Sequence, residues 1–351
     1  MRIVITGASG NLGTALLRRL APDGHELVGL SRRPPEDPGD VQWQAVDLTD
    51  DSATVVLRQV FEGADAVVHL AWAFQPSHDL DYLESVGVGG TEKVLRAAAV
   101  AGVPHVLHLS SIGAYSAKRG DEPVDESWPT DGVPSSPYSR HKAATERLLD
   151  EFEHGGDGPT VTRLRPGIVG QRTAGSALLR YAVPALVPAK AIGLVPLVLL
   201  DRALAVPVVH ADDVADAIAR CLERRAGGAF NVCAPTPVTT TLIARALSAR
   251  AVHVPAAAVR ATVAASWHAR IQQLDPGWID LAYAVPLMDC SRAERELDWQ
   301  PRSDGPEVLR ELIDGLKDAA AGRTPVLRPR TVVNRLQDLL HRGPVGERRE
   351  T

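Results

Sequence analysis

RIVITGASGNLG, at residues 2–13, passes from a short apolar run into glycines spaced three residues apart. Ile3, Val4 and Ile5 are contiguous and β-branched, as expected for a parallel strand that is buried on both faces. The apolar residues then return at helical spacing, at Leu12, Leu16, Leu17 and Leu20. The stretch therefore predicts a strand, a glycine-rich loop and a helix.

The glycines suit a loop that holds a phosphate. The N–H groups and the positive dipole end of a helix N-terminus favour an anion, and residues without a Cβ let it approach the backbone. We expect Gly7 to make the turn, Gly10 to admit a diphosphate and Gly13 to let helix and strand pack closely. Because a strand precedes this loop and a helix follows it, a dinucleotide site is favoured over an ordinary turn.

Thr6–Gly13 match the pattern TGxxGxxG, and the chain here resembles the extended short-chain dehydrogenase/reductase family, in its NAD-dependent epimerase/dehydratase branch. The resemblance covers roughly residues 1 to 320. It implies an α/β fold, with a Rossmann-type doubly wound parallel sheet over residues 1–165 and a smaller C-terminal α/β substrate lobe over 166–322, interleaved with the core. Residues 323–351 form a C-terminal tail outside it. In the loop, Ser9, Asn11 and Leu12 are expected to contact the cofactor.

Composition narrows the possible partners. The chain has 351 residues, of which 45% are hydrophobic and 23% charged, and its net charge of -5 indicates neither a nucleic acid nor an anionic membrane as a partner. Cys221, Cys233 and Cys290 lack CxxC spacing, so reduced thiols in a cytoplasmic protein are expected.

The strand at the N-terminus leaves no room for a signal peptide. Val183–Leu200 is apolar, but Lys190 and prolines interrupt it, so we interpret it as a wall of the smaller lobe, with a lipid-facing role as the alternative.

The end of the second expected strand, His25–Leu30, bears on the choice of cofactor. An acidic residue usually binds the adenosine ribose of NAD at this point, but Ser31 stands there, followed by Arg32 and Arg33. Guanidinium groups can hold a 2′-phosphate, so the sequence favours NADP, with NAD possible. The alternative is a solvated basic pair.

Other cofactor contacts follow from the resemblance. The third expected strand, Val41–Val46, ends in Asp47-Leu48, which relatives place against the adenine ring, although a chance acid at a strand end is an equal explanation. The fourth, Asp65–Leu70, includes an HLA segment that puts Leu70 and Ala71 beside the cofactor. A helix is expected over Asp79–Ala101. Within it, Gly87 replaces the Asn of the family's NxxGT pattern, which removes a side chain that supports the active site in relatives.

The candidate catalytic residues follow the fifth expected strand, Val103–Leu109, which ends in Ser110-Ser111. A helix is expected over Pro137–Phe152, and it carries Tyr138 and Lys142 on one face because they are four residues apart. A lone YxxxK says little, but here it follows the glycine-rich loop, the strands and the serine pair in the family's order. The resemblance implies Tyr138 as general acid/base, Lys142 as its electrostatic partner and nicotinamide-ribose ligand, and Ser111 as the hydroxyl that orients the substrate.

We predict no metal site. His105 and His108 are three apart on a strand, so they face opposite sides, and both are interpreted as structural. A polar loop around Asp121–Glu126 is expected to be a solvated lid or connector. In the segment 210–215, HADDVA, a carboxylate of Asp212 or Asp213 is expected to cap the following helix.

The second half of the chain is expected to build the smaller lobe. A sixth strand, Thr160–Leu164, leads to an RPxxxxG-like segment that places Pro166 near the nicotinamide. The remaining expected elements are a strand at Ala229–Cys233, a helix at Thr239–Leu247, a strand at Ala251–Val254 and a terminal helix at Asp289–Trp299. For Arg328–Thr351 we expect partial disorder or packing on a partner subunit.

The reaction and the substrate stay open at this stage. Ser111 is followed by Ile112-Gly113, without the Asp-Glu pair of the family's dehydratases, so dehydration is disfavoured. Three alternatives remain: a reductase, an epimerase that uses the same site, and a non-catalytic NADP-binding sensor or scaffold. Net reduction is slightly favoured. A nucleotide sugar would need arginines for its diphosphate, whereas the Val183–Leu200 wall suggests an apolar carbonyl or alcohol. Candidate arginines are Arg172, Arg180, Arg202, Arg270 and Arg292. The resemblance also implies a homodimer through the two long helices.

Overall fold

A parallel sheet of seven strands, in the order β11-β6-β5-β4-β1-β2-β3, forms the centre of the computed structural model, which describes residues 1–73, 77–154, 158–182 and 188–329. The strands are β1 (Arg2–Thr6), β2 (Glu26–Ser31), β3 (Gln42–Ala45), β4 (Ala66–His69), β5 (His105–Leu109), β6 (Thr160–Pro166) and β11 (Gly228–Val232). The chain reverses direction across the sheet between β1 and β4, so the expected doubly wound α/β fold is confirmed.

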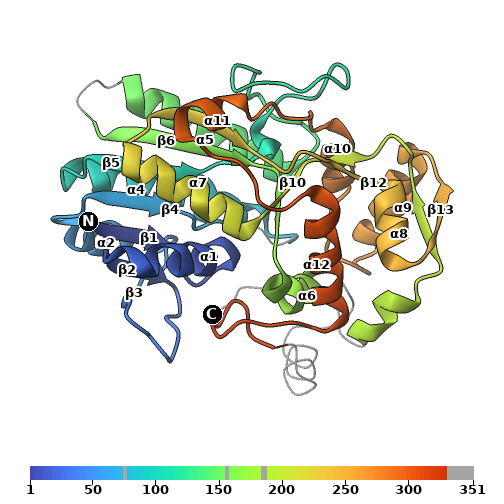
Figure 1. Ribbon diagram of the computed structural model, residues 1–351, viewed down its shortest axis with the longest axis horizontal. Coiled ribbons are helices and arrows are strands. Elements are labelled where there is room, and N and C mark those ends of the chain that lie inside the picture. Colours follow the sequence, from blue (N-terminus) through green and yellow to red (C-terminus); the bar gives the residue numbers. More distant parts are fainter. Residues whose placement is uncertain (74–76, 155–157, 183–187, 330–351) are drawn as a thin grey trace.

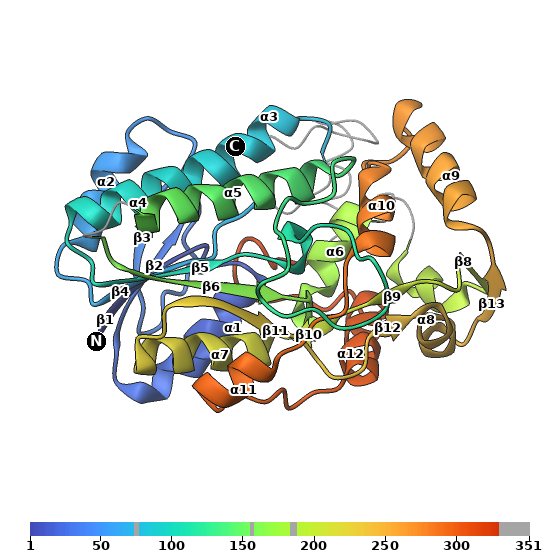
Figure 2. The same ribbon diagram turned by 90° about the horizontal axis from the view of Figure 1, so that it is seen from above.

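Helices cover both faces of the sheet (Figure 1; Figure 2). On one face lie α1 (Asn11–Leu20), α7 (Ala211–Arg224) and α11 (Ser291–Leu297), and on the other α2 (Ala53–Phe61), α4 (Gly90–Val100) and α5 (Pro137–His154). Leu16, Ile218 and Phe230 belong to the apolar core of the first face, whereas Phe61, Leu95 and Leu149 belong to that of the second. The inner strands β1 and β4 are therefore buried on both sides, which explains their apolar runs, whereas the edge strand β3, with the sequence QWQA, is largely exposed.

The smaller lobe lies beyond the carboxyl ends of the strands (Figure 1). Its two-stranded sheets pair β7 (Ile168–Gly170) with β10 (Val208–His210), β9 (Ala205–Val206) with β12 (Val238–Thr239), and β8 (Leu197–Leu200) with β13 (Arg250–His253). Its helices are α6 (Gly175–Ala182), α8 (Thr240–Leu247), α9 (Ala256–His268), α10 (Gly277–Ala284) and α12 (Gly305–Lys317). Segments of this lobe alternate along the chain with segments of the central sheet.

Two expectations about the second half are wrong. The strand predicted at Ala229–Cys233 is β11 of the central sheet, where it pairs with β6 and Phe230 is fully buried. Neither Asp212 nor Asp213 caps α7, because the helix begins earlier and His210 takes the cap position, accepting from the N–H of Asp212. Asp213 instead accepts from the backbone N–H groups of Arg302 and Ser303. The chain after α11 is thus tied to the first turn of α7.

The apolar segment Val183–Leu200 also differs from expectation. Residues 183–187 lie outside the described part of the chain. From residue 188 on, the segment forms a 3₁₀ turn (Ala189–Leu194) and β8 at the outer end of the lobe, with Leu194 79% and Leu199 52% exposed. These residues face outward, so the described part of the segment is not a wall of the substrate site.

The long helix expected over Asp79–Ala101 is divided. It consists of α3 (Leu80–Glu84), a π-helical turn over Ser85–Gly89 and α4. The turn coincides with glycines, which are poor helix formers and tolerate an irregular turn. The polar loop predicted as a lid or connector is docked rather than free: Val124 pairs with Met288, and Glu126 accepts from the N–H of Asn231.

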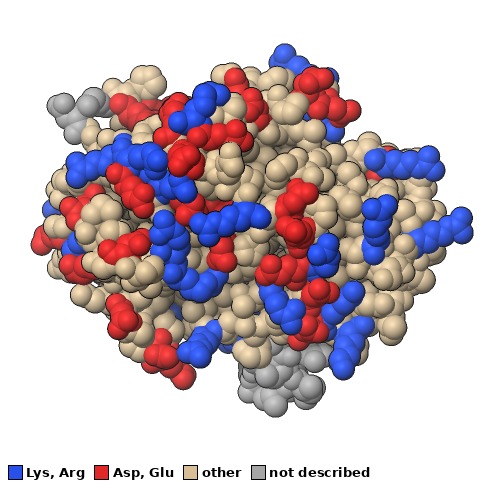
Figure 3. Space-filling view, in the orientation of Figure 1, with Lys and Arg blue, Asp and Glu red and all other residues tan. Residues whose placement is uncertain are grey.

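The surface and the thiols agree with a modest net charge and a reduced protein. On the face shown in Figure 3, acidic and basic side chains are interspersed. Cys221, Cys233 and Cys290 are free thiols. A search of the described residues finds no helix with the length and apolar character to cross a membrane.

Candidate active site

One cavity of about 510 Å³ runs from the glycine-rich loop to the first turns of α5. Every residue that the sequence suggested for catalysis or cofactor binding lines it: Gly7, Ser9, Gly10, Asn11, Leu12, Gly13, Arg32, Arg33, Asp47, Leu48, Leu70, Ala71, Ser111, Tyr138, Lys142 and Pro166. They come from the carboxyl ends of strands and from the loops that follow, which is where open α/β sheets bind ligands. None of the five candidate arginines for a diphosphate lies among the described lining residues.

The glycine-rich loop has the geometry expected for it. Gly7 has a φ of +69°, and a Cβ there would lie 2.7 Å from the backbone nitrogen of Ala71. A Cβ on Gly13 would lie 2.4 Å from the carbonyl oxygen of Gly7. Any larger residue at either position would collide with backbone, so these glycines set the close approach of the β1–α1 loop to its neighbours.

The far end of the cavity is basic and contains an unsatisfied hydroxyl. Arg32 and Arg33 line it, and Arg32 donates to the Tyr82 hydroxyl. Ser31 is buried, and no group in the described part of the chain hydrogen-bonds its Oγ. A buried hydroxyl beside two guanidinium groups fits a ligand that brings hydrogen-bonding oxygens, such as a ribose phosphate. The carboxylate of Asp47 accepts from the backbone N–H and the hydroxyl of Thr49, so it also stabilises the turn after β3.

The Tyr138 ring is held between two tryptophans at the other end of the cavity. It stacks on Trp278 of α10, with ring centroids 4.9 Å apart, and meets the edge of Trp72 at 6.3 Å. Ser111 follows β5, and its Oγ accepts from the N–H of Gly113 at 3.0 Å. Lys142 is buried. Its Nζ donates to the carbonyl of Leu109 at 2.8 Å and lies 3.5 Å from the centroid of the Trp72 ring.

Burial changes the protonation of both residues. It raises the pKa of Tyr138 to about 12, although a hydrogen bond with Ser111 acts in the opposite direction. It lowers the pKa of Lys142 to about 7, and the negative charge of Glu146 opposes that shift. At neutral pH the phenol therefore carries its proton, and Lys142 is poised between its charged and neutral forms.

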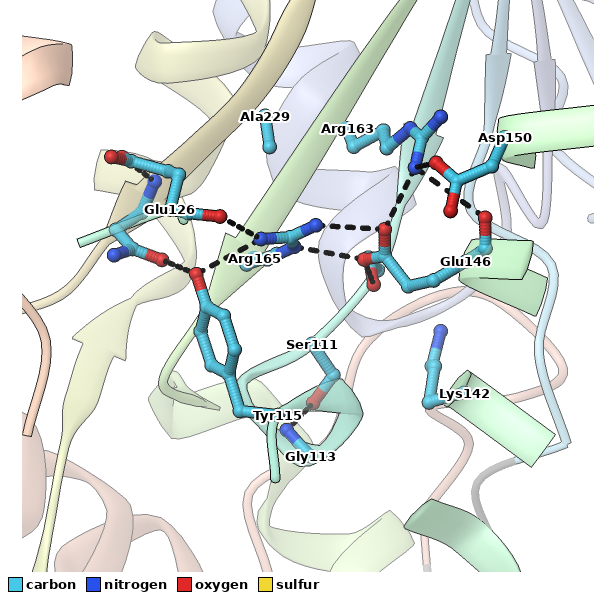
Figure 4. Close-up of polar contacts among 12 residues, drawn as sticks. Ser111, Gly113, Tyr115, Glu126, Lys142, Glu146, Asp150, Arg163, Arg165 and Ala229 are labelled. Atoms are coloured by element: carbon cyan, nitrogen blue, oxygen red, sulfur yellow. Dashed lines mark hydrogen bonds and ion pairs between the residues drawn. The ribbon is translucent and has the colours of Figure 1, made fainter. Parts of the chain in front are cut away.

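A buried ionic network lies behind the candidate catalytic residues (Figure 4). Glu146, one turn after Lys142 on α5, is fully buried and accepts from Arg165 twice at 2.9 Å and from Arg163 at 3.1 Å. Ser110 donates to the same carboxylate at 2.5 Å. Arg165 continues to the hydroxyl of Tyr115, which donates to Asn231 of β11. The network joins α5 to the central sheet and to the loop that precedes α5.

The two histidines of β5 are structural in the described chain. His105 shares a hydrogen bond with Thr162 at 2.7 Å, and His108 lies 5.3 Å from the ring of His69. Burial lowers the pKa of His108 well below its usual value, so its ring is neutral. Within the described residues, no group of three or more His, Cys, Asp or Glu side chains is placed to hold a metal ion.

Sequence reasoning missed three parts of the cavity wall. Trp72 directly follows the HLA segment, so its position could have indicated a contact. Trp278 and Leu281 lie on α10, which no motif marks. Residues 325–328, which we call the C-terminal strap, also line the cavity, and the hydroxyl of Thr324 beside them donates to the carbonyl of Ser9 at 2.7 Å. The start of the expected tail is therefore packed on the glycine-rich loop; residues 330–351 lie outside the described part.

A family model described as the NAD dependent epimerase/dehydratase family matches residues 3–233. The chain belongs to this family. The matched residues include the glycine-rich loop, the serine after β5, and Tyr138 and Lys142 on α5.

Relatives within and near the family share parts of the chain. An uncharacterised protein of Mycobacterium tuberculosis is 26% identical over 316 residues, which cover 89% of this chain but only 30% of the relative. The chain thus spans less than a third of that relative's length. The UDP-glucose 4-epimerase of Mycolicibacterium smegmatis is 30% identical over 166 residues, covering 44% of this chain and 52% of the epimerase.

A solved structure of a UDP-glucose 4-epimerase from Stenotrophomonas maltophila, with bound NAD and a formylated UDP-arabinopyranose, has the same fold. It superposes with a TM-score of 0.70 over 91% of this chain and 98% of that chain, at 21% identity.

Proposed function

We propose that the chain is an NAD(P)-dependent oxidoreductase that transfers a hydride between nicotinamide C4 and a carbonyl or secondary alcohol. The observation that supports this is the convergence of Ser111, Tyr138 and Lys142 in the same cavity as the glycine-rich loop. When bound, the nicotinamide cofactor supplies or accepts the hydride. The roles below are those that the chain's own side chains would take, over a nucleotide-binding domain at 1–165 and a smaller lobe at 166–322.

Tyr138 donates the proton in the reductive direction. Its phenol is protonated at neutral pH because burial raises its pKa to about 12. As the substrate oxygen takes that proton, the resulting phenolate is stabilised by the ammonium group of Lys142 and by a hydrogen bond from Ser111. The same two hydroxyls, Tyr138 and Ser111, would hold the substrate oxygen before transfer. The proton is replaced from solvent, and in the oxidative direction the phenolate acts as the base.

The cofactor at the basic end is proposed to be NADP. Ser31, Arg32 and Arg33 present a hydroxyl and two guanidinium groups where a carboxylate would repel a 2′-phosphate. Replacing Arg32 and Arg33 by Ala should lower kcat/KM for NADPH at least tenfold and leave that for NADH within about twofold. Equal losses with both cofactors would contradict the proposed preference.

A nucleotide-sugar epimerase is the second candidate, because a relative and a solved neighbour carry that name. An epimerase would use the same Tyr138 but return the hydride to the opposite face of the substrate carbon. Net consumption of NADPH separates the two, since an epimerase regenerates its cofactor and a reductase does not.

A cytoplasmic homodimer through α4 and α5 belongs to the proposal as well, and size-exclusion chromatography of the full chain tests the dimer.

The deciding experiment compares Tyr138→Phe with wild type in NADPH oxidation against aldehydes and ketones. Removing the phenolic hydroxyl should lower kcat at least 100-fold, within the range of general acid catalysis, while NADPH still binds. Tyr283→Phe is a matched control, because Tyr283 accepts from the N–H of Asp201 and does not line the cavity. Full activity in Tyr138→Phe, or no binding of either cofactor to wild type, would refute the proposed function.

A further inference from the structure

The described wall of the cavity has few charged side chains, and three of them, Arg32, Arg33 and Asp47, lie at its cofactor end. Arg32 and Arg33 follow β2, Asp47 follows β3, and Arg328 belongs to the C-terminal strap, whose neighbour Thr324 is bonded to the glycine-rich loop. Lys142 is the only other Arg, Lys, Asp or Glu among the described lining residues, and it stands behind Tyr138. The described lining that α10 and Ile112 contribute beside Tyr138 therefore offers a diphosphate no guanidinium group.

Three of the five candidate arginines for a substrate diphosphate make contacts within the protein, and none of the five is among the described lining residues of the cavity. Arg172 pairs with Asp318 at 2.5 Å, and Arg292 donates to the carbonyl of Ala229 at 2.8 Å. Arg180 donates to the carbonyl of Arg328 at 2.7 Å, where it anchors the C-terminal strap. In each case at least one guanidinium donor is directed to the protein itself.

The substrate half is instead walled by one apolar face of α10. Trp278, Leu281, Ala282 and Val285 recur at helical spacing, so they form a single stripe, and all four line the cavity. Ile112 lies next to Ser111, and it also lines the cavity. An apolar group placed here loses contact with water and gains the aromatic and aliphatic surface of the stripe.

The absence of a side chain at Gly87 leaves room for the Trp72 indole, which extends the aromatic wall of the cavity past Lys142. A Cβ at this position would lie 2.8 Å from the Trp72 ring, so a larger residue would displace the indole. With glycine there, the indole covers the Nζ of Lys142 and meets the edge of Tyr138. The departure from the NxxGT pattern thus exchanges a polar side chain for aromatic surface beside the reacting hydroxyl.

We propose that the substrate is a ketone or secondary alcohol carried on an apolar ring skeleton, with no phosphate, whose ring lies on the stripe of Trp278, Leu281 and Val285. This rests on the proposed function. In reduction, the carbonyl carbon gains the hydride of the reduced nicotinamide and the oxygen gains the Tyr138 proton, giving the ring alcohol and the oxidised cofactor.

The test measures kcat/KM of the full chain with NADPH for 2-decalone, cyclohexanone and tetrahydropyran-4-one, in parallel with epimerisation of UDP-glucose and UDP-galactose. Each buried CH₂ is worth about fourfold, so 2-decalone should exceed cyclohexanone at least tenfold, and cyclohexanone should exceed its ring-oxygen analogue. Trp278→Ala should lower the ratio of decalone to cyclohexanone at least fivefold. Leu281→Ser, a smaller change on the same stripe, should lower it in the same direction.

Trp267→Ala is the matched control, because this tryptophan lies on neighbouring α9 and stacks on His78 outside the cavity. Its ratio should match that of wild type. Faster turnover of either UDP-sugar than of any ring ketone would overturn the inference and leave a nicotinamide enzyme in place. NADPH binding without turnover of any ring ketone, or a ratio unchanged in both stripe variants, would overturn it too. Absence of NADPH and NADH binding would instead overturn the proposed function.

Discussion

Replacing Glu146 by Gln should destabilise the protein more than any other removal of one charge on α5. The carboxylate is fully buried and accepts from Arg165, Arg163 and Ser110. Gln is nearly the same size but turns an N–H₂ donor towards these donors. The carbonyl oxygen of Gln could still accept one hydrogen bond, but Arg165 would lose its counter-ion and keep only neutral partners, among them the Tyr115 hydroxyl and the carbonyl of Glu126. Leaving a buried charge without its counter-ion costs about 3–5 kcal/mol.

The expected change in melting temperature follows from the size of the chain. An unfolding entropy of about 2.1 cal/mol/K per residue over 351 residues gives about 0.74 kcal/mol/K, so the loss corresponds to roughly 4–7 °C. Differential scanning calorimetry of wild type and Glu146→Gln measures it.

Glu153→Gln is the matched control on the same helix. Glu153 also pairs with Arg163, but its side chain is 36% exposed, and Arg163 retains Asp150 and Glu146. Such a pair contributes under about 1 kcal/mol, so the melting temperature should fall by less than about 1.5 °C. If the two variants melted within 1 °C of each other, the reasoning that burial decides the cost would be wrong.

Three further predictions concern the cavity. Burial lowers the pKa of Lys142 to about 7, so its ammonium form is lost as the pH rises above 7. The kcat/KM for ketone reduction should therefore fall tenfold per pH unit above pH 7. A pH profile that is flat from pH 6 to 9 would contradict this prediction. Gly13→Ala should abolish NADPH binding in a fluorescence titration, because its Cβ would lie 2.4 Å from the Gly7 carbonyl oxygen. Gly120→Ala is the control and should bind NADPH normally, because the space around Gly120 is open. Equal binding by the two variants would refute the role of the close approach. Thr324→Val should weaken NADPH binding roughly fivefold, because it removes the hydrogen bond that holds the C-terminal strap to Ser9. Thr262→Val, on the exposed helix α9, is the control and should leave NADPH binding unchanged. An unchanged Kd for Thr324→Val would show that the strap does not shape the site.

The sequence was sufficient for the inner strands of the central sheet, because burial on both faces produces a run of apolar residues that is visible without knowledge of distant contacts. Ile3–Ile5 and Ala66–Val68 are continuous apolar runs, and they correspond to strands β1 and β4. The convergence of Ser111 and Tyr138 followed from their order in the chain, since the loop after β5 and the start of α5 meet at one edge of the sheet.

What could not be predicted depends on contacts between distant residues. An apolar run does not indicate which surface it packs on. The strand β11 was therefore expected in the smaller lobe rather than in the central sheet. For the same reason, residues 188–200 were expected at the site rather than at the outer end of the lobe. The capping residue of α7 was misjudged because a shift of the helix start moved the cap from an aspartate to His210. Trp72 fits only because Gly87, 15 positions later, lacks a side chain, and no periodic pattern signals such a pair.

The bond between Thr324 and Ser9 joins residues 315 positions apart, and it has a consequence for biosynthesis. The ribosome makes the glycine-rich loop more than 300 residues before this part of the pocket wall, which corresponds to about 15–60 s at ordinary rates of translation. During that interval the nascent chain would carry a pocket that lacks one part of its wall, and the pocket would be complete only when the strap docks.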